Sequence, residues 1–230
     1  TQGVSSAASD VYKRQSLGTG IVNVAGVSGA ASVDWGLSGD MLPEGMSVNL
    51  AWSPKASGAL TNDKGTGGAG DSRSGSGWDV VLQHSGLMDG LNVFGGWSAV
   101  EQAAAAASGD KSERTLGATY ATGGVTLGYQ YSISNTNAKL STATDEYENT
   151  LYGVSFAVND DLSLSYGRQT SDRSKVSGTT VEAEVDSIQL SYSMGGASIK
   201  IAENSVDNAS YTSTTTFDKD GTTIALTLAF

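Results

Sequence analysis

The sequence predicts an all-β protein, a transmembrane antiparallel up-and-down β-barrel with about eleven strands in residues 31–230. Three observations support this prediction. Apolar and small polar residues alternate over many short segments, as in strands with two unlike faces. Tight turns alternate with long polar loops between these segments. No stretch approaches the roughly 18–20 apolar residues of a membrane-spanning helix.

The alternating segments define the strands in chain order. In "VTLGYQYSI", for example, Val125 and Leu127 fall on one face, whereas Thr126 and Gln130 fall on the other. No stretch shows the apolar stripe of an amphipathic helix. The predicted strands lie at 31–38, 46–54, 78–86, 91–101, 112–122, 125–135, 147–158, 162–171, 183–194, 197–206 and 222–230.

The connections between these strands predict how the strands are placed in a membrane. Short turns fall at 39–45, 88–90, 122–124, 159–161 and 195–196, and long polar loops fall at about 56–76, 102–112, 136–147, 172–181 and 207–221. Membrane barrels have short periplasmic turns and longer outer loops. A soluble Greek-key sandwich would have less regular connections, because some of its strands cross over.

Strand parity predicts which side chains line the lumen. The polar face carries mainly Ser, Thr, Gly, Gln and Ala, where a solvated sheet would carry more charges. Lys200 is the main candidate for a basic group in the channel, and Asp34 and Asp79 are its acidic counterparts. For each of them, a solvated charge at the rim is the alternative. The predicted pore-lining residues are Asp34, Asn49, Asp79, Thr126, Gln130, Ser163, Ser165, Gln189, Ser191, Lys200, Thr223 and Thr227.

Composition argues against other classes of function. The net charge of −11 argues against a nucleic-acid partner, because phosphate binding needs a basic surface. The absence of Cys excludes a Cys-ligated zinc site, and His84 is the only histidine. "GTGGAG" at 65–70 lacks the flanking strand and helix of a dinucleotide site. The sequence therefore predicts no enzyme, no catalytic residues and no cofactor.

Metal binding has one weak candidate. "DKDG" at 218–221 matches part of a calcium loop, but no glutamate closes the twelve-residue frame. A dedicated metal site is therefore not expected. A loosely bound divalent cation at the outer loops is the weaker alternative.

Three segments resemble the C-terminal half of Gram-negative general diffusion porins of the marine alphaproteobacterial type. They are "YGVSFAVNDDLSLSYGRQ", "SIQLSYSMGGASIKIAENSVDN" and "TTIALTLAF". The resemblance implies a homotrimer of barrels with about sixteen strands, each enclosing a water-filled channel for passive diffusion of small hydrophilic solutes and ions. It implies the bacterial outer membrane, with the lipid bilayer and lipopolysaccharide as partners. A non-transport barrel anchor or a surface adhesion domain is the alternative.

The ends of the chain give three further expectations. Residues 1–15 resemble a translated sequencing-adapter tail, so we expect the chain to be an N-terminally truncated fragment. Residues 16–30 are expected to be the end of the loop that constricts the pore, and a strand over 21–27 is the alternative. The resemblance implies that Phe230 is the terminal aromatic signal read by the outer-membrane assembly machinery.

Overall fold

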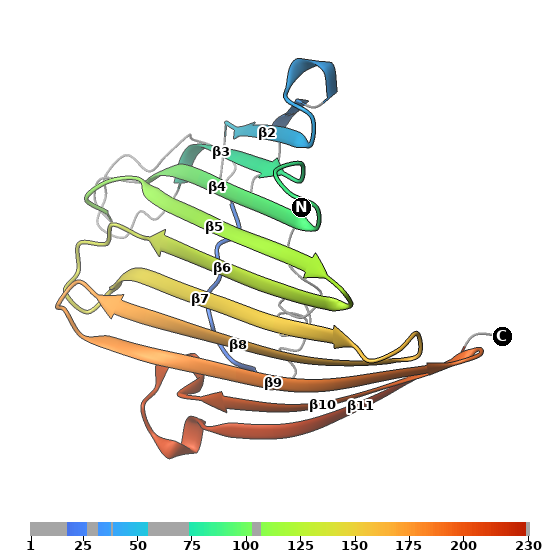
Figure 1. Cartoon of the computed structure of the whole chain (residues 1–230). Helices are drawn as coiled ribbons and strands as arrows, with labels where there is room; N and C mark the ends of the chain where they lie inside the picture. Colours follow the sequence, from blue (N-terminus) through green and yellow to red (C-terminus); the bar gives the residue numbers. More distant parts are fainter. Residues whose placement is uncertain (1–17, 27–31, 38, 55–73, 103–106, 229–230) are drawn as a thin grey trace.

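The computed structural model describes residues 18–26, 32–37, 39–54, 74–102 and 107–228. These residues form one sheet of 11 strands (Figure 1). The strands are β1 (Val33–Leu37), β2 (Met46–Ser53), β3 (Ser74–His84), β4 (Leu91–Gln102), β5 (Lys111–Thr122), β6 (Val125–Asn135), β7 (Thr144–Ala157), β8 (Leu162–Lys175), β9 (Thr180–Met194), β10 (Ala197–Asp207) and β11 (Lys219–Leu228). The described residues also contain three 3-10 turns: η2 (Gly39–Met41), η3 (Ala209–Tyr211) and η4 (Thr215–Phe217).

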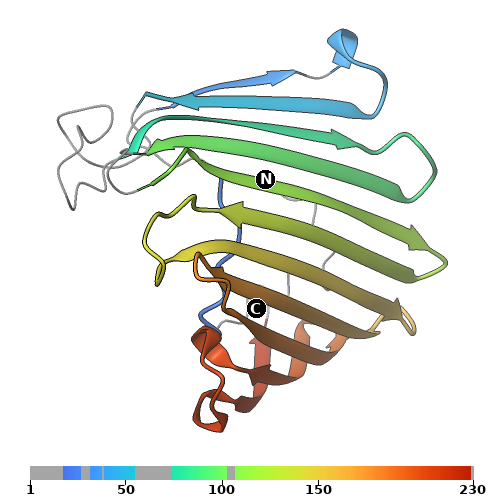
Figure 2. The same cartoon turned by 90° about the vertical axis from the view of Figure 1, so that its left-hand side faces the viewer.

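Every strand pairs in antiparallel fashion with its neighbour in the chain, and the order of the sheet is the order of the sequence. This confirms the predicted all-β, up-and-down architecture. The sheet is strongly curved, and it remains open between β1 and β11 in the described residues (Figures 1 and 2). None of the helices within the described ranges has the length and apolarity needed to cross a membrane.

The connections give the sheet two different ends. The turns between β3 and β4, β5 and β6, β7 and β8, and β9 and β10 are short, and we call this edge the short-turn end. The loops between β2 and β3, β4 and β5, β6 and β7, and β10 and β11 are longer and lie at the opposite edge, the long-loop end. Gly90 illustrates a tight turn: its φ is +76°, and a Cβ there would lie 2.1 Å from the carbonyl oxygen of Ala121. Only glycine fits that position.

The strand boundaries correct one predicted loop. The sequence predicted a long loop over 172–181, but β8 continues to Lys175 and β9 begins at Thr180. The polar residues of this region still pair across the two strands, with Asp172 opposite Glu182. Polar composition suggested a loop because we expected strands to end where their apolar faces end. The backbone ladder does not need an apolar face, since its own hydrogen bonds satisfy the backbone groups.

The two faces of the sheet differ in chemistry. Large apolar side chains are exposed on one face, which we call the outer face, and Leu116, Ile188 and Ile224 are each more than 60% exposed there. The four tryptophans are 40–52% exposed, and Trp78 and Trp97 meet edge to face at 5.2 Å. Contiguous exposed apolar surface of this kind is typical of a surface that meets lipid or another protein.

Residues 18–26 lie across the other face, which we call the inner face (blue in Figures 1 and 2). They form no strand. The alternative of a strand over 21–27 is therefore wrong for residues 21–26, and Val27 lies outside the described residues. That segment 18–26 is the end of a pore-constricting loop remains a prediction.

Candidate functional site

The candidate site is the inner face of the curved sheet. Register establishes which side chains share it, because each directly opposite pair points to the same side. Thr126 pairs with Ser155, which pairs with Ser165, which pairs with Gln189. All twelve predicted pore-lining residues lie on this face: Asp34, Asn49, Asp79, Thr126, Gln130, Ser163, Ser165, Gln189, Ser191, Lys200, Thr223 and Thr227. Their role in a pore remains a prediction.

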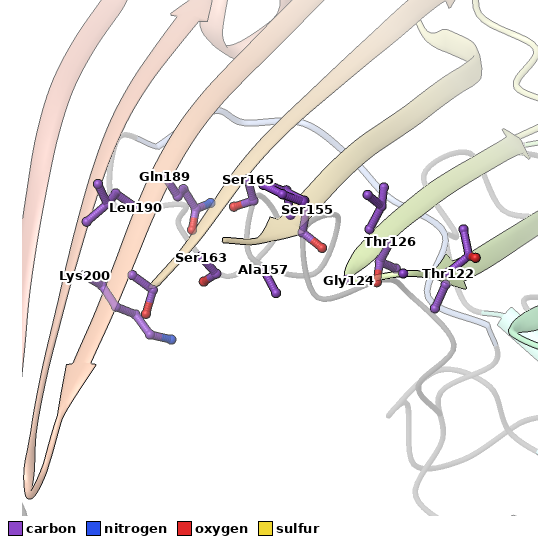
Figure 3. Close-up of a pocket in the computed structure, with 15 residues that line it drawn as sticks. Thr122, Gly124, Thr126, Ser155, Ala157, Ser163, Ser165, Gln189, Leu190 and Lys200 are labelled. Atoms are coloured by element: carbon purple, nitrogen blue, oxygen red, sulfur yellow. The ribbon is translucent and has the colours of Figure 1, made fainter. Parts of the chain in front are cut away.

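Six of these residues surround one open hollow of 590 Å³ near the short-turn end (Figure 3). They are Thr126, Ser163, Ser165, Gln189, Ser191 and Lys200. Ser155 adds another hydroxyl, and the β5–β6 turn closes one side of the hollow. Hydroxyl and amide groups therefore dominate this part of the inner face, with one ammonium group among them.

A second hollow, of 440 Å³, lies at the side of the sheet formed by β1, β2 and β3. Asp34, Asn49 and Asp79 from β1, β2 and β3 line it together with Ala25. The predicted acidic residues thus gather on the first three strands, whereas Lys200 lies on β10. In the strand order, the carboxylates of Asp34 and Asp79 therefore lie near β1, and the ammonium of Lys200 lies near β11.

Segment 18–26 is fastened to the inner face at its C-terminal end by Glu113 of β5. The Oε2 atom of Glu113 accepts hydrogen bonds of 2.9 Å from the backbone N–H groups of Ala25 and Gly26. Its Oε1 atom accepts a hydrogen bond of 3.2 Å from Ser134 and pairs with the Lys111 ammonium at 2.6 Å. A carboxylate that is 5% exposed is stabilised by these donors, because burying an unpaired charge is costly.

The middle of the segment is held by two amide side chains. Asn149 of β7 donates a hydrogen bond of 3.1 Å to the carbonyl oxygen of Val22. Gln169 of β8 donates one of 2.8 Å to the side-chain oxygen of Asn23. Because the segment covers them, Asn149 is fully buried and Gln169 only 4% exposed.

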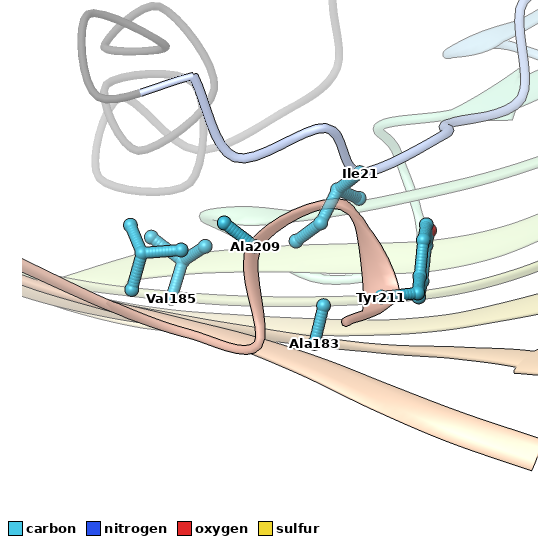
Figure 4. Packing of buried hydrophobic residues seen from close by; sticks show 6 residues of the cluster. Ile21, Ala183, Val185, Ala209 and Tyr211 are labelled. Carbon is cyan, nitrogen blue, oxygen red and sulfur yellow. The ribbon is translucent and has the colours of Figure 1, made fainter. Parts of the chain in front are cut away.

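The N-terminal part of the segment packs against the loop between β10 and β11. Ile21 joins a buried apolar cluster with Ala183, Val185, Val206, Ala209 and Tyr211 (Figure 4). The hydroxyl of Tyr211 accepts a hydrogen bond of 3.1 Å from the N–H of Val22 and lies 2.7 Å from the hydroxyl of Ser171. Arg173 lies 4.9 Å from the centre of the Tyr211 ring and donates to its carbonyl oxygen at 3.0 Å.

Close backbone contact completes this anchor. The N–H of Ser210 donates a hydrogen bond of 2.7 Å to the carbonyl oxygen of Thr19. A Cβ at Gly20 would lie 2.8 Å from the Cα of Ser210, and Gly20 has a φ of +68°. Gly20 therefore satisfies both the backbone conformation and the close approach, which no other residue does without strain.

The inner face also contains a band without side chains, which separates the segment from the hollow around Lys200. Gly128, Gly153 and Gly167 lie directly opposite one another on β6, β7 and β8. The row on its long-loop side contains Gln169, and the row on its short-turn side contains Ser165. The band leaves the inner face flat at this level.

Sequence reasoning missed the residues that hold segment 18–26. Parity alone could have found Glu113, since it shares the inner face with Thr115 and is a charge directly between Ser98 and Ser134 of the neighbouring strands. Asn149 and Gln169 look like the other small polar residues of their strands. Tyr211 lies in a polar loop, where no periodicity signals that its ring is buried.

The remaining predicted sites have these positions. Phe230, the predicted assembly signal, lies outside the described residues, as do residues 1–15 of the predicted non-native tail. Among the residues that the structure describes, no group of three or more His, Cys, Asp or Glu side chains could hold a metal ion. Asp218 of "DKDG" accepts a hydrogen bond of 3.0 Å from the N–H of Asn208. A loosely bound cation at the outer loops remains a prediction.

Comparisons with known proteins reveal a family match and similar folds. A family model described as Gram-negative porin matches residues 3–197. The structure is similar to that of OmpF from Salmonella typhi in complex with daunomycin, with a TM-score of 0.63 and 13% identity. It is also similar to the anion-selective porin from Comamonas acidovorans, with a TM-score of 0.60 and 13% identity. At these identities the structural likeness establishes the fold alone.

The extent of these matches is also informative. The alignment covers 85% of this chain and 61% of the OmpF chain, and 86% of this chain and 59% of the Comamonas porin. The chain therefore spans about 60% of the length of the solved structures that it resembles. No curated protein sequence matches it.

Proposed function

This chain belongs to the Gram-negative porin family, and we propose that the whole protein forms a water-filled channel for passive diffusion of small hydrophilic solutes and ions. Membership of the family places the protein in the bacterial outer membrane. The observation that carries the proposal is the contrast between the faces of one sheet: exposed tryptophans and aliphatic residues outside, and hydroxyls, amides and isolated charges inside.

The outer face supports contact with lipid. Leu116 of β5, Leu127 of β6 and Ile224 of β11 project from the outer face, and each is at least 49% exposed. Burying such residues in hydrocarbon is favourable by about 25 cal/mol per Å² of apolar area. In water the same surface would be an aggregation hazard.

The inner face supports passage of polar solutes. Segment 18–26 lies across it and, in this proposal, narrows the channel as the end of a constricting loop. Asp34, Asp79 and Lys200 are the charges that the inner face offers to a passing ion near its two hollows. Since selectivity follows pore width and lining charge, these residues would set the ion preference.

The partners follow from the same proposal. The lipid bilayer and lipopolysaccharide are the expected surroundings of an outer-membrane porin. We further propose a homotrimer, assembly through the outer-membrane machinery with Phe230 as its signal, and no enzymatic activity.

Single-channel recording of the full-length protein in a planar bilayer tests the function. We expect stepwise conductance from a species that migrates differently in sodium dodecyl sulfate before and after heating. A heat-modifiable barrel that inserts but conducts no ions would instead support a non-transport anchor. A protein that stays soluble without detergent would contradict both.

A further inference from the structure

We propose that the hollow around Lys200 is a weak binding site for small hydroxylated carboxylates, such as sugar acids. The inference rests on the channel function proposed above, because solute reaches the inner face only through a lumen. It goes beyond that function by naming a class of solute and the residues that contact it.

The ammonium group of Lys200 is the positive charge that would attract an anionic solute to the hollow. It is exposed on the inner face of β10 and forms no ion pair with any described residue. The other inward-facing cations in the described strands are engaged or distant. Lys111 pairs with Glu113, Arg173 stacks on Tyr211, and Lys219 donates to the carbonyl oxygen of Gly18. Lys175 ends β8 at the long-loop end.

Neutral polar groups surround this single ammonium. Ser163 and Ser165 of β8 and Ser191 of β9 line the hollow beside Lys200. Figure 3 shows the side chains of Ser163, Ser165 and Lys200 around the same open space. Each hydroxyl can donate and accept a hydrogen bond, which matches the hydroxyls of a sugar derivative. Gln189 adds both an amide donor and a carbonyl acceptor.

This donor set favours a carboxylate over a phosphate. One ammonium balances one negative charge, and the lining includes no Arg fork. Phosphate sites typically use bidentate Arg or several backbone N–H groups. The volume of 590 Å³ lies within the range of about 300–1,000 Å³ that is usual for small-molecule sites.

The position of the hollow favours transient binding. It opens at the short-turn end, separated by the glycine band from segment 18–26, so a bound solute does not compete with the contacts of that segment. Conduction requires binding that is strong enough to attract a solute and weak enough to release it. One exposed charge with hydroxyl neighbours meets that requirement.

Current block by gluconate tests the site. The full-length protein is recorded in a planar bilayer at constant ionic strength, and potassium gluconate or glucose is added on the short-turn side. We expect gluconate to reduce the potassium chloride current of the wild type and glucose to leave it unchanged. In Lys200→Gln the half-blocking concentration should rise by about fivefold or more, because a charged contact is lost.

Two further variants provide matched comparisons. Lys139→Gln removes an exposed Lys from the β6–β7 loop at the opposite end and should leave the gluconate block unchanged. Ser163→Ala combined with Ser165→Ala should weaken the block by about twofold to fivefold while retaining the ammonium. Equal block by gluconate and glucose, or equal half-blocking concentrations in Lys200→Gln and Lys139→Gln, would overturn the proposal.

Equilibrium binding separates this inference from the channel function. Saturation-transfer NMR detects gluconate bound to the detergent-solubilised protein without requiring conduction. If the protein conducts and gluconate binds without dependence on Lys200, only the site is wrong. If the protein does not conduct, the channel function is wrong, and loss of the gluconate signal in Lys200→Gln still supports the site.

Discussion

The carboxylate of Glu113 accepts a hydrogen bond from the backbone N–H of Gly26, 87 residues earlier in the chain. The same oxygen accepts a second bond from the N–H of Ala25. One side chain of β5 thereby fixes the direction in which segment 18–26 leaves the inner face. The position of this C-terminal end of the segment depends on the Glu113 carboxylate more than on apolar packing, because the contacts described there are polar.

Glu113→Ala should release this end of the segment. Two partly buried hydrogen bonds to a carboxylate are lost, and a hydrogen bond to a charged group contributes about 1.5–3 kcal/mol. We expect faster hydrogen exchange at Ala25 and Gly26 and a larger, noisier single-channel conductance. Glu182→Ala, which removes an exposed carboxylate from the outer face of β9, serves as the control. Unchanged exchange in Glu113→Ala would contradict the role of Glu113.

Tyr211→Phe should loosen the other end of the segment while preserving its packing. The ring stays in the cluster with Ile21, but the hydroxyl bonds to Val22 and Ser171 are lost. We expect a loss of about 1 kcal/mol in local opening free energy, read from exchange of the Val22 amide. Tyr211→Ala also removes the ring and should cost about 3–5 kcal/mol. Equal effects of the two substitutions would mean that the ring contributes nothing, and unchanged exchange in Tyr211→Phe would mean that the hydroxyl contributes nothing.

The same anchor should respond to alkaline pH. Burial, the largest influence, raises the pKa of the Tyr211 hydroxyl, which lies in the loop between β10 and β11, above its ordinary value. The neutral form is therefore favoured when the segment is docked, so its contribution is fully present below pH ~10 and is lost as pH rises through the raised pKa. Exchange at Val22, divided by the base-catalysed intrinsic rate at each pH, should accelerate over that range in the wild type. Tyr211→Phe should lack this acceleration.

Thr126 and Leu127 are neighbours on opposite faces of β6, so the same substitution should have different effects at the two positions. Leu127→Lys places a charge on the apolar outer face near the short-turn end and should reduce outer-membrane yield, because such a charge costs from about 0–1 kcal/mol at the interface to about 2–4 kcal/mol at mid-membrane. Thr126→Lys places it in the inner hollow and should shift the reversal potential towards anions at normal yield. Similar yields for both variants would contradict the assignment of the faces.

The order of the strands, and the face on which each side chain lies, were predictable because both follow from the local alternation of apolar and polar residues. Thr126 and Leu127 illustrate this: their parity alone assigns them to opposite faces, and the register agrees. The short connections were predictable for the same reason, since the preference of Gly90 and its neighbours for a turn depends only on residues close in sequence. The extent of β8 and β9 was not predictable, because the polar pair Asp172 and Glu182 carries no apolar signal although it continues the ladder.

The position of segment 18–26 on the inner face could not be predicted from the sequence. Its contacts join residues far apart in the chain, such as Val22 with Tyr211 across 189 positions. Asn149 and Gln169 differ from other inward-facing polar residues only in what covers them. A single sequence contains no periodicity that identifies such partners, and only the curvature of the sheet brings them together.

The distance in sequence between segment 18–26 and its anchors has a consequence for the order of folding. Lys219 of the last strand reaches the carbonyl oxygen of Gly18 across 201 positions, and the loop before that strand supplies Tyr211. Loop closure over such separations is slow, and it can finish only when β10 and β11 have joined the sheet. Segment 18–26 therefore gains its full set of contacts only after β10, β11 and the loop between them are in place, at the end of the assembly of this sheet.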